Sequence, residues 1–351
     1  MNVRQVAFAG TLVVAVLTIL GFWYGGIPDA QGPAPQAAVP PPSHPVAIRS
    51  LEWTRDGIIA IGTRGGGGPL FLYDAGTRSN RLLVDAAAGR VRCVSLAADR
   101  QHLLAGTYDG RLWWIDLNAP ASPRKLVELP PTLFTAATVT DDAEMIAAGT
   151  SAGSICLCDP STGTSRVLSP ERQSGVADLH FSRDRKWLAS AHNDGSVHLW
   201  DLTSETALPD FARHGDVARA VAFLPDGERI ISAGLDDTVR IWDLARREET
   251  WRQQARLLGV NSLAVSEDGS TVAWGGFDHA IVVWNLDSDR FELEIDISTP
   301  TVAHLKFSPD GSFLLADGGV DAEGAIFLYD LRRGGEEKRI SLLLPVPARD
   351  P

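Results

Sequence analysis

The chain has 351 residues, of which 44% are hydrophobic and 22% are charged. This balance is typical of a folded globular protein and excludes a chain that is disordered throughout. The formal net charge of −12 repels phosphate backbones, so we expect no nucleic-acid partner. The three cysteines, Cys93, Cys156 and Cys158, lack the spacing of zinc ligands, and they are too few for a disulfide framework.

The first element in chain order is an apolar segment at the N-terminus. No charged residue occurs between Arg4 and Asp29, and residues 6–24 are almost wholly apolar. As a helix, this run is long enough to cross the roughly 30 Å of bilayer hydrocarbon. We therefore predict a short flank at 1–4 and a transmembrane signal-anchor helix at 5–26. A cleaved secretory signal is the alternative, although the aromatic cluster Phe22-Trp23-Tyr24 suits a membrane interface.

Positive charge is found only on the N-terminal side of this segment. Arg4 precedes it, and the next Lys or Arg is Arg49. The positive-inside rule then predicts a single-pass protein with a cytoplasmic N-terminus and an extracytoplasmic remainder, periplasmic in a bacterium. Residues 27–45 are rich in Pro, Ala and Gly, a composition that favours either an extended polyproline linker or a disordered one.

A repeat governs the rest of the chain. Each unit contains an aspartate between two short apolar runs, which predicts a hairpin. A third apolar run follows and ends in an apolar or aromatic residue and then Asp or Asn, as in Trp200-Asp201. The aspartates recur every 42 or 43 residues and are Asp56, Asp99, Asp142, Asp184, Asp226, Asp268 and Asp310.

These residues resemble WD40 repeats, whose units of about 40 to 45 residues each form one four-stranded propeller blade. The resemblance implies an all-β fold: a seven-bladed WD40-type β-propeller at 46–345, preceded by one transmembrane helix and the linker, and followed by a tail at 346–351. The repeats would lie at about 46–86, 87–129, 130–170, 171–213, 214–257, 258–298 and 299–345. A strand at 338–344 would complete the last blade, so the ring would close by side-chain packing without strand exchange.

WD40 repeats often contain a structural set of hydrogen-bonded His, Ser or Thr, Asp and Trp side chains. The fifth unit resembles this set in full, with His214, Ser232, Asp236 and Trp242. The fourth unit contains Ser190, Asp194 and Trp200 but lacks the histidine at the corresponding position.

Two local patterns that suggest chemistry are better explained by the repeat. The G-x-S-x-G match at 149–153 falls at a hairpin turn, whereas a hydrolase nucleophile requires a strand-to-helix turn. His180, His192 and His198 lie on strands whose alternating faces do not obviously bring them together. We therefore predict no catalytic residue, no metal site and no cofactor.

The resemblance places a partner site at the mouth of the central channel. Seven residues before the repeat aspartates stand Arg49, Arg92, Thr135, Ala177, Arg219, Asn261 and Ala303. Residues before the second-to-third-strand turns include Tyr108, Ser151, Asn193, Leu235 and Phe277. From these we select Arg49, Arg92, Arg219, Asn261, Tyr108, Leu235 and Phe277 as partner-binding residues, because Arg and aromatic residues dominate binding hot spots.

We therefore predict a membrane-anchored interaction scaffold that is not an enzyme. Its partner would be a protein or peptide with acidic or aromatic side chains. The alternative is a hydrolase- or lactonase-like propeller, or an envelope sensor, that binds a small ligand in the channel. That alternative would need a ring of inward Asp, Glu and His, and the positions assigned to the mouth carry Ala, Thr and Arg instead.

Overall fold

The structure is a computed structural model that describes residues 47–53, 59–64, 70–74, 79–84, 90–119, 122–128, 132–169, 174–255, 258–297, 301–317 and 326–333. The predicted anchor at 5–26, the linker at 27–45 and the tail at 346–351 lie outside these residues. Within the described part of the chain, no helix is both long and apolar enough to cross a membrane.

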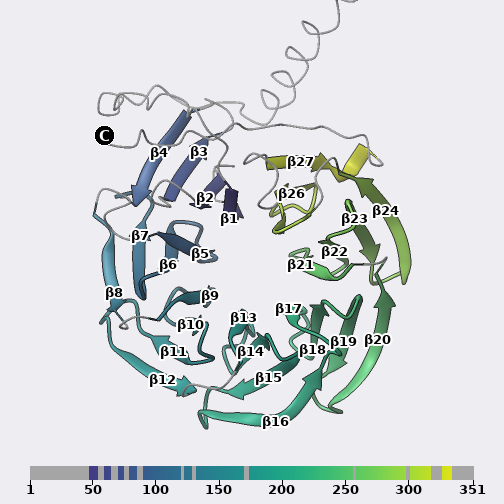
Figure 1. Ribbon diagram of the computed structural model, residues 1–351, viewed down its shortest axis with the longest axis horizontal. Coiled ribbons are helices and arrows are strands. Elements are labelled where there is room, and N and C mark those ends of the chain that lie inside the picture. Colours follow the sequence, from purple (N-terminus) through teal and green to yellow (C-terminus); the bar gives the residue numbers. More distant parts are fainter. Residues whose placement is uncertain are drawn as a thin grey trace, which may run out of the picture.

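The described chain folds into antiparallel sheets set radially around a common axis, as the repeat predicts (Figure 1). In each sheet, consecutive strands are neighbours, and the first strand is innermost (Figure 1). Six sheets have four strands and one has three described strands, and each matches one sequence repeat. We call them blades 1 to 7 in chain order.

The strands of the first three blades have the following bounds. Blade 1 contains β1 (Ala47–Trp53), β2 (Ile59–Arg64), β3 (Leu70–Asp74) and β4 (Ser79–Val84). Blade 2 contains β5 (Val91–Leu96), β6 (His102–Thr107), β7 (Arg111–Asp116) and β8 (Arg124–Glu128). Blade 3 contains β9 (Phe134–Val139), β10 (Ile146–Thr150), β11 (Ile155–Cys158) and β12 (Ser165–Ser169).

The remaining blades continue the same order. Blade 4 contains β13 (Val176–Phe181), β14 (Trp187–His192), β15 (Ser196–Asp201) and β16 (Thr206–Arg213). Blade 5 contains β17 (Ala218–Phe223), β18 (Arg229–Gly234), β19 (Thr238–Asp243) and β20 (Glu248–Gln254). Blade 6 contains β21 (Val260–Val265), β22 (Thr271–Gly276), β23 (Ala280–Asn285) and β24 (Arg290–Asp296). Blade 7 contains β25 (Leu305–Phe307), β26 (Phe313–Asp317) and β27 (Ile326–Asp330), followed by the 3₁₀ turn η3 (Leu331–Arg333).

The prediction of seven four-stranded blades is confirmed for six of them. The seventh sheet has three described strands, and the strand predicted at 338–344 lies outside the described residues. Among the described strands, β1 belongs only to blade 1 and β25 only to blade 7, so no strand is exchanged between these two blades.

Neighbouring blades bury each other's apolar faces. Phe134 of blade 3 is fully buried and belongs to a cluster that also contains Leu104 and Leu112 of blade 2. Trp200 and Trp242 are buried in the same manner between later blades. A single sheet could not shield both of its faces from water, so the ring arrangement accounts for most of the apolar burial.

The repeat aspartates organise the turns between first and second strands. Asp142, for example, accepts hydrogen bonds from the Glu144 amide (3.0 Å) and from the Thr140 hydroxyl (2.7 Å). The residue after the aspartate has a positive φ, which explains why glycine often stands there, as at Gly227 (φ 71°).

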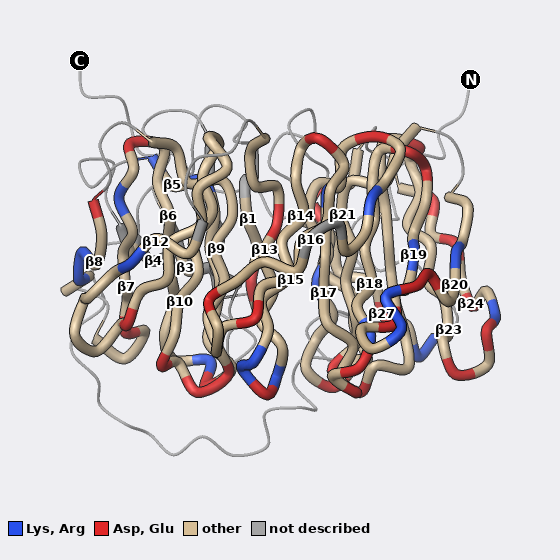
Figure 2. The backbone as a smooth tube through the Cα atoms, turned by 90° about the horizontal axis from the view of Figure 1, so that it is seen from below, with Lys and Arg blue, Asp and Glu red and all other residues tan. Residues whose placement is uncertain are grey.

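These turns define the two ends of the ring. We call the end with the aspartate turns the turn face. The opposite end holds the starts of the first strands and the turns between second and third strands, and we call it the mouth face. Figure 2 shows charged residues of both signs concentrated in turns along one edge of the ring. On the turn face, for example, Arg185 pairs with Glu144 of the neighbouring blade at 2.7 Å.

The mouth of the central channel as candidate functional site

The positions that we selected at the mouth coincide with β-bulges. In the pairing of β5 with β6, the register shifts between Val91 and Cys93, which leaves Arg92 as the extra residue. The same shift leaves Arg219 unpaired in β17 and Asn261 unpaired in β21. Arg49 occupies the bulge of β1, but its side chain lies outside the description. A bulge redirects the side chain of its extra residue, so the bulges place these side chains at the mouth.

Arg92 and Arg219 form a pair of like charges at the mouth. Partial burial lowers the pKa of Arg219, and the positive charge of Arg92 lowers it further. The Nε of Arg219 is buried and has no hydrogen-bond partner among the described residues. Both effects disfavour the charged guanidinium and would be relieved by an anion.

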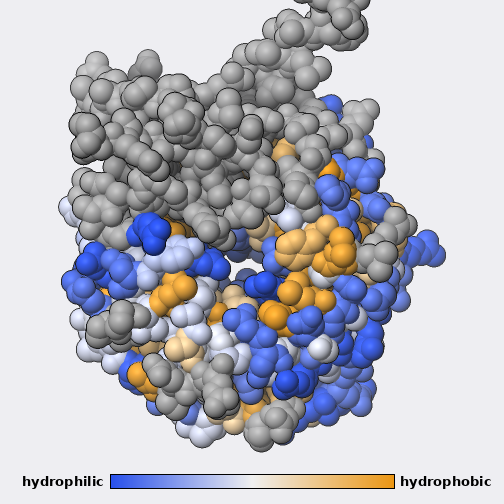
Figure 3. Space-filling view, viewed as in Figure 1, coloured by the Kyte–Doolittle hydropathy of each residue, from blue (hydrophilic) through white to orange (hydrophobic). Residues whose placement is uncertain are grey.

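An apolar surface lies on one side of this pair. We call it the shelf, and it consists of Leu235, Leu258 and Phe277. Leu258 is 67% exposed and Phe277 is 37% exposed, which is unusual for such large apolar side chains. In Figure 3, hydrophobic residues gather beside the central opening over blades 5 and 6.

Two glycines hold the shelf together. A Cβ added at Gly259 would lie 2.8 Å from Leu235 Cδ2, so the Leu235 side chain packs directly on that glycine. A Cβ at Gly276 would lie 1.8 Å from the Gly259 carbonyl oxygen, so these two backbones touch. Leu258 and Phe277 are the neighbours of these glycines in the chain, and the shelf is therefore a continuous surface.

The remaining selected residues lie elsewhere on the same face. Tyr108 is half-buried in blade 2, and the guanidinium of Arg90 stacks over its ring at 5.2 Å. The Asn261 side chain donates to the Val302 carbonyl at 3.0 Å, so it links blades 6 and 7. Sequence reasoning missed Arg90 and Leu258, which precede the first strands of their blades, because the pattern we used considered only one position at each strand start.

The channel also contains charged residues that the sequence reasoning did not expect. Asp178 and His180 project from β13, and Glu52 and Lys306 project from β1 and β25. Desolvation raises the pKa of Asp178 to about 6, while Lys306 lowers it and Glu52 raises it. Desolvation by the surrounding strands and the charge of Lys306 lower the pKa of His180 to about 4. The expectation that inward Asp, Glu and His are missing was therefore wrong, because it considered only the strand starts.

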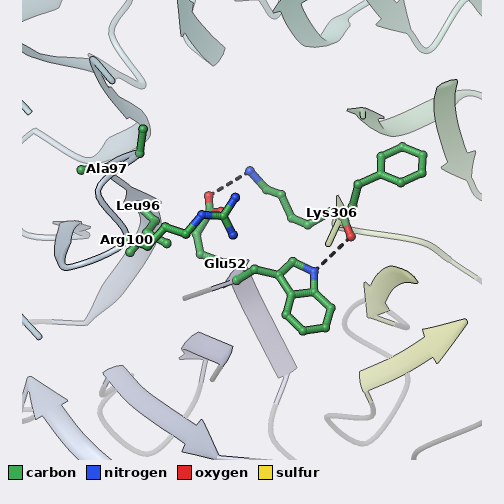
Figure 4. A pocket seen from close by; sticks show the side chains of 8 residues that line it. Glu52, Leu96, Ala97, Arg100 and Lys306 are labelled. Atoms are coloured by element: carbon green, nitrogen blue, oxygen red, sulfur yellow. Dashed lines mark hydrogen bonds and ion pairs between the residues drawn. The ribbon is translucent and has the colours of Figure 1, made fainter. Parts of the chain in front are cut away.

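Glu52 and Lys306 also join the two ends of the ring (Figure 4). The Lys306 ammonium lies 2.8 Å from the Glu52 carboxylate, and the Trp53 indole donates to the Lys306 carbonyl at 3.3 Å. These contacts connect blade 7 to blade 1 through side chains, as predicted. A cavity of about 140 Å³ adjoins them, and its wall includes Arg100, which pairs with Glu267 at 3.5 Å.

The predicted hydrogen-bond set of blade 5 is joined together in the structure. His214 Nε2 lies 2.8 Å from the Ser232 hydroxyl, and its Nδ1 lies 2.9 Å from Asp236. The Trp242 indole donates to the same hydroxyl at 2.9 Å. This set links β18 and β19 to the segment before β17, and Arg240 extends it by pairing with Asp236.

Blade 4 lacks a histidine at the position that corresponds to His214, as the sequence shows, but another histidine takes its place. His192 Nε2 lies 2.9 Å from the Ser190 hydroxyl, which also accepts from the Trp200 indole at 2.9 Å. Asp194 instead caps its own turn by accepting from the Ser196 hydroxyl at 2.6 Å. The histidine therefore comes from the second strand of the blade rather than from the segment before the first strand.

The other patterns of the sequence have structural explanations. Ser151 of the G-x-S-x-G match lies in the turn between β10 and β11, as predicted. His192 and His198 do come together, with ring centroids 4.9 Å apart, contrary to our expectation. The described residues nevertheless contain no group of three or more His, Cys, Asp or Glu side chains able to hold a metal ion.

Comparison with known proteins agrees with this architecture. Residues 131–231 match the model of the Vps8 β-propeller family. The chain is 35% identical over 60 residues to the Protein LST8 homolog of Drosophila melanogaster, which is 17% of this chain and 19% of that protein. It is 25% identical over 181 residues to the APC/C activator protein CDC20 of Saccharomyces cerevisiae, which is 51% of this chain and 28% of that protein. The chain thus spans well under a third of either relative.

Proposed function

We propose that this chain, whose fold and matches are those of WD40-type β-propellers, is an interaction scaffold that holds a partner protein at its channel mouth and is tethered to a membrane by residues 5–26. The observation that carries the proposal is the mouth itself. It combines two arginines without an acidic partner at hydrogen-bond distance, among the described residues, with an exposed apolar shelf. Exposed apolar area beside unsatisfied polar groups is typical of protein-binding surfaces.

The relatives support an interaction role without defining the partner. One of them is described as an activator protein of the APC/C, which is a statement about that protein alone. The tether is supported by the apolar composition of residues 6–24. The extracytoplasmic orientation is supported by the position of Arg4 before that segment.

Site-directed photocrosslinking in intact cells tests the binding role. A photoreactive phenylalanine analogue replaces Leu258 on the shelf, and in a matched control it replaces Val167, which is 61% exposed on the outer strand β12. We expect a discrete crosslinked protein from position 258 and none from position 167. The same products from both positions, or none from position 258, would contradict the proposal.

The tether and its orientation have their own test. A reporter that is active only outside the cytoplasm is fused after Pro351, and membrane fractions are washed with carbonate. We expect an active reporter in the washed membranes. A soluble product would contradict the proposed tether, and an inactive reporter in the membranes would contradict the proposed orientation. Neither result would contradict the binding role.

A small ligand in the channel is the second candidate function. Asp178, His180, Glu52 and Lys306 favour it, because carboxylates, an imidazole and an ammonium can together bind a small polar molecule. A metabolite that raises the melting temperature of the wild type, but not of Asp178→Asn, would support it.

A further inference from the structure

We propose that the mouth recognises an extended peptide segment in which an acidic side chain is followed, about three residues later, by a large apolar side chain. The carboxylate would lie between Arg92 and Arg219, and the apolar side chain would lie on the shelf of Leu235, Leu258 and Phe277. This proposal rests on the proposed function, in which a protein binds at the mouth, and it adds the chemistry of the segment that binds.

The arginine pair determines the charge of the segment. A guanidinium binds a carboxylate best through two parallel N–H donors, which an ammonium does not offer. The Nε of Arg219 is buried and has no hydrogen-bond partner within the described chain, so the guanidinium is not held by an acidic group at hydrogen-bond distance there. A carboxylate beside the guanidinium of Arg219 would offset the repulsion between Arg219 and Arg92.

The shelf determines the second feature of the segment. The Leu235 amide donates to the Val217 carbonyl at 2.9 Å, which fixes this end of the shelf two residues from Arg219. Gly259, directly before β21 of blade 6, packs against Leu235 of blade 5, and Gly276 of the same blade packs against Gly259, so the shelf is formed before anything binds. A preformed surface binds without first losing conformational entropy.

The arrangement also sets the spacing. Arg219 belongs to blade 5, whereas Leu258 and Phe277 belong to blade 6. Sheets that pack face to face lie about 10 Å apart, and an extended peptide advances about 3.3 Å per residue. A segment that crosses from one blade to the next therefore covers this interval in about three residues.

Parallel selections from one peptide library test this inference. A random dodecapeptide library displayed on phage is selected against the full chain in detergent micelles. Three variants are selected in the same manner: Arg92→Gln with Arg219→Gln, Leu258→Ser with Phe277→Ser, and, as a control, Arg183→Gln with Val167→Ser. The control changes a charge in an aspartate turn and an exposed apolar residue on an outer strand.

We expect the wild type and the control to enrich peptides with an acid and a large apolar residue at the stated interval. The arginine variant should lose only the acid from its consensus, and the shelf variant only the apolar residue. In a synthetic consensus peptide, replacing Glu by Gln should weaken binding to the wild type by about tenfold or more, since a charge-assisted hydrogen bond contributes about 1.5–3 kcal/mol.

Several outcomes would overturn the inference. They are a consensus without an acid, an acid that persists in the arginine variant, or a consensus peptide that binds more than tenfold tighter when phosphoserine replaces its acid. If the arginine variant does not fold, Arg219→Lys preserves the charge while removing the two-donor geometry, and we expect it to weaken the consensus peptide as well. Enriched peptides that lack an acid but depend on Leu258 would contradict only this inference, whereas no enrichment by any protein would contradict the proposed function.

Discussion

Single residues on the first strands of blades 1, 4 and 6 connect each of these blades to the next. Ser50 accepts a hydrogen bond from the Val94 amide at 3.1 Å, and Ser262 accepts one from the Leu305 amide at 3.0 Å. Asp178 does the same for the Val221 amide at 3.0 Å. A serine therefore suffices for this connection, and the aspartate in blade 4 adds a charge that is costly to bury.

We predict that Asp178→Ser reduces the dependence of stability on pH. Since its pKa is raised from 3.8 to about 6, the folded protein binds this proton more tightly than the unfolded chain does. The resulting stabilisation is complete below about pH 4 and is lost as the pH rises through about 6. Relative to the variant, the free energy of unfolding of the wild type should fall by roughly 1–3 kcal/mol between pH 4 and pH 7. Denaturant titrations at both pH values measure it.

Ser50→Ala is the matched control, because it removes a connection of the same kind without a charge. It should lower the free energy of unfolding equally at both pH values. An Asp178→Ser protein with the wild-type pH profile would mean that Asp178 does not titrate as described.

A second residue-scale prediction concerns the hydrogen-bond set of blade 5. Ser232→Ala leaves the Trp242 indole and His214 Nε2 without their shared partner in a buried site. We expect the free energy of unfolding to fall by about 1–3 kcal/mol. Ser204→Ala, in an exposed turn, should have little effect in the same denaturant titration. Similar losses from both substitutions would contradict a special role for the set.

At the scale of strands and turns, the sequence predicts much of the structure, because the same turn pattern occurs in all seven repeats. The aspartates locate the hairpins, and the alternating apolar runs locate the strands around them. The bulges were not predictable, since Arg92 and Arg219 differ in no visible way from paired strand residues. The sequence also did not predict that His192 of the second strand would complete the hydrogen-bond set of blade 4. His192 stands where blade 5 has Gly234, and a Cβ at Gly234 would lie 2.8 Å from His214 Nδ1, so two different backbone positions fill one space.

We predict that Gly276→Ala disrupts the shelf. Its new Cβ would overlap the Gly259 carbonyl oxygen, so one of the two backbones must move. The free energy of unfolding should fall by about 1–3 kcal/mol, and binding of the consensus peptide should weaken in parallel. Gly163→Ala is the control, because a Cβ at Gly163 would meet no atom within 4 Å, although its φ of 73° is unfavourable for alanine. It should lower stability moderately and leave peptide binding unchanged.

At the scale of the whole molecule, the described chain closes its ring without sharing a strand between blades 1 and 7. The contacts that replace strand pairing are the Glu52–Lys306 ion pair and the Trp53 indole hydrogen bond (Figure 4). The Lys306 side chain is 44% exposed, so water and salt weaken the ion pair.

A double-mutant cycle on Glu52→Gln and Lys306→Gln measures this closure. We expect a coupling free energy of about 0.5–1 kcal/mol that decreases between 0.05 and 0.5 M NaCl. Trp53→Phe removes the indole hydrogen bond and should lower the free energy of unfolding by about 1 kcal/mol at either salt concentration. A coupling of zero at low salt would show that other contacts join the two blades.

The start of β1 at Ala47 on the mouth face has a consequence for any partner. If residues 5–26 form the proposed tether, a chain leaving the bilayer at residue 26 would reach the ring on the same side as the channel opening. Residues 27–45, if extended at about 3 Å each, allow the ring to stand roughly 60 Å from the lipid. The channel opening would then face the bilayer. Only proteins that fit between the ring and the lipid, such as the membrane-proximal parts of neighbouring membrane proteins, could bind at it.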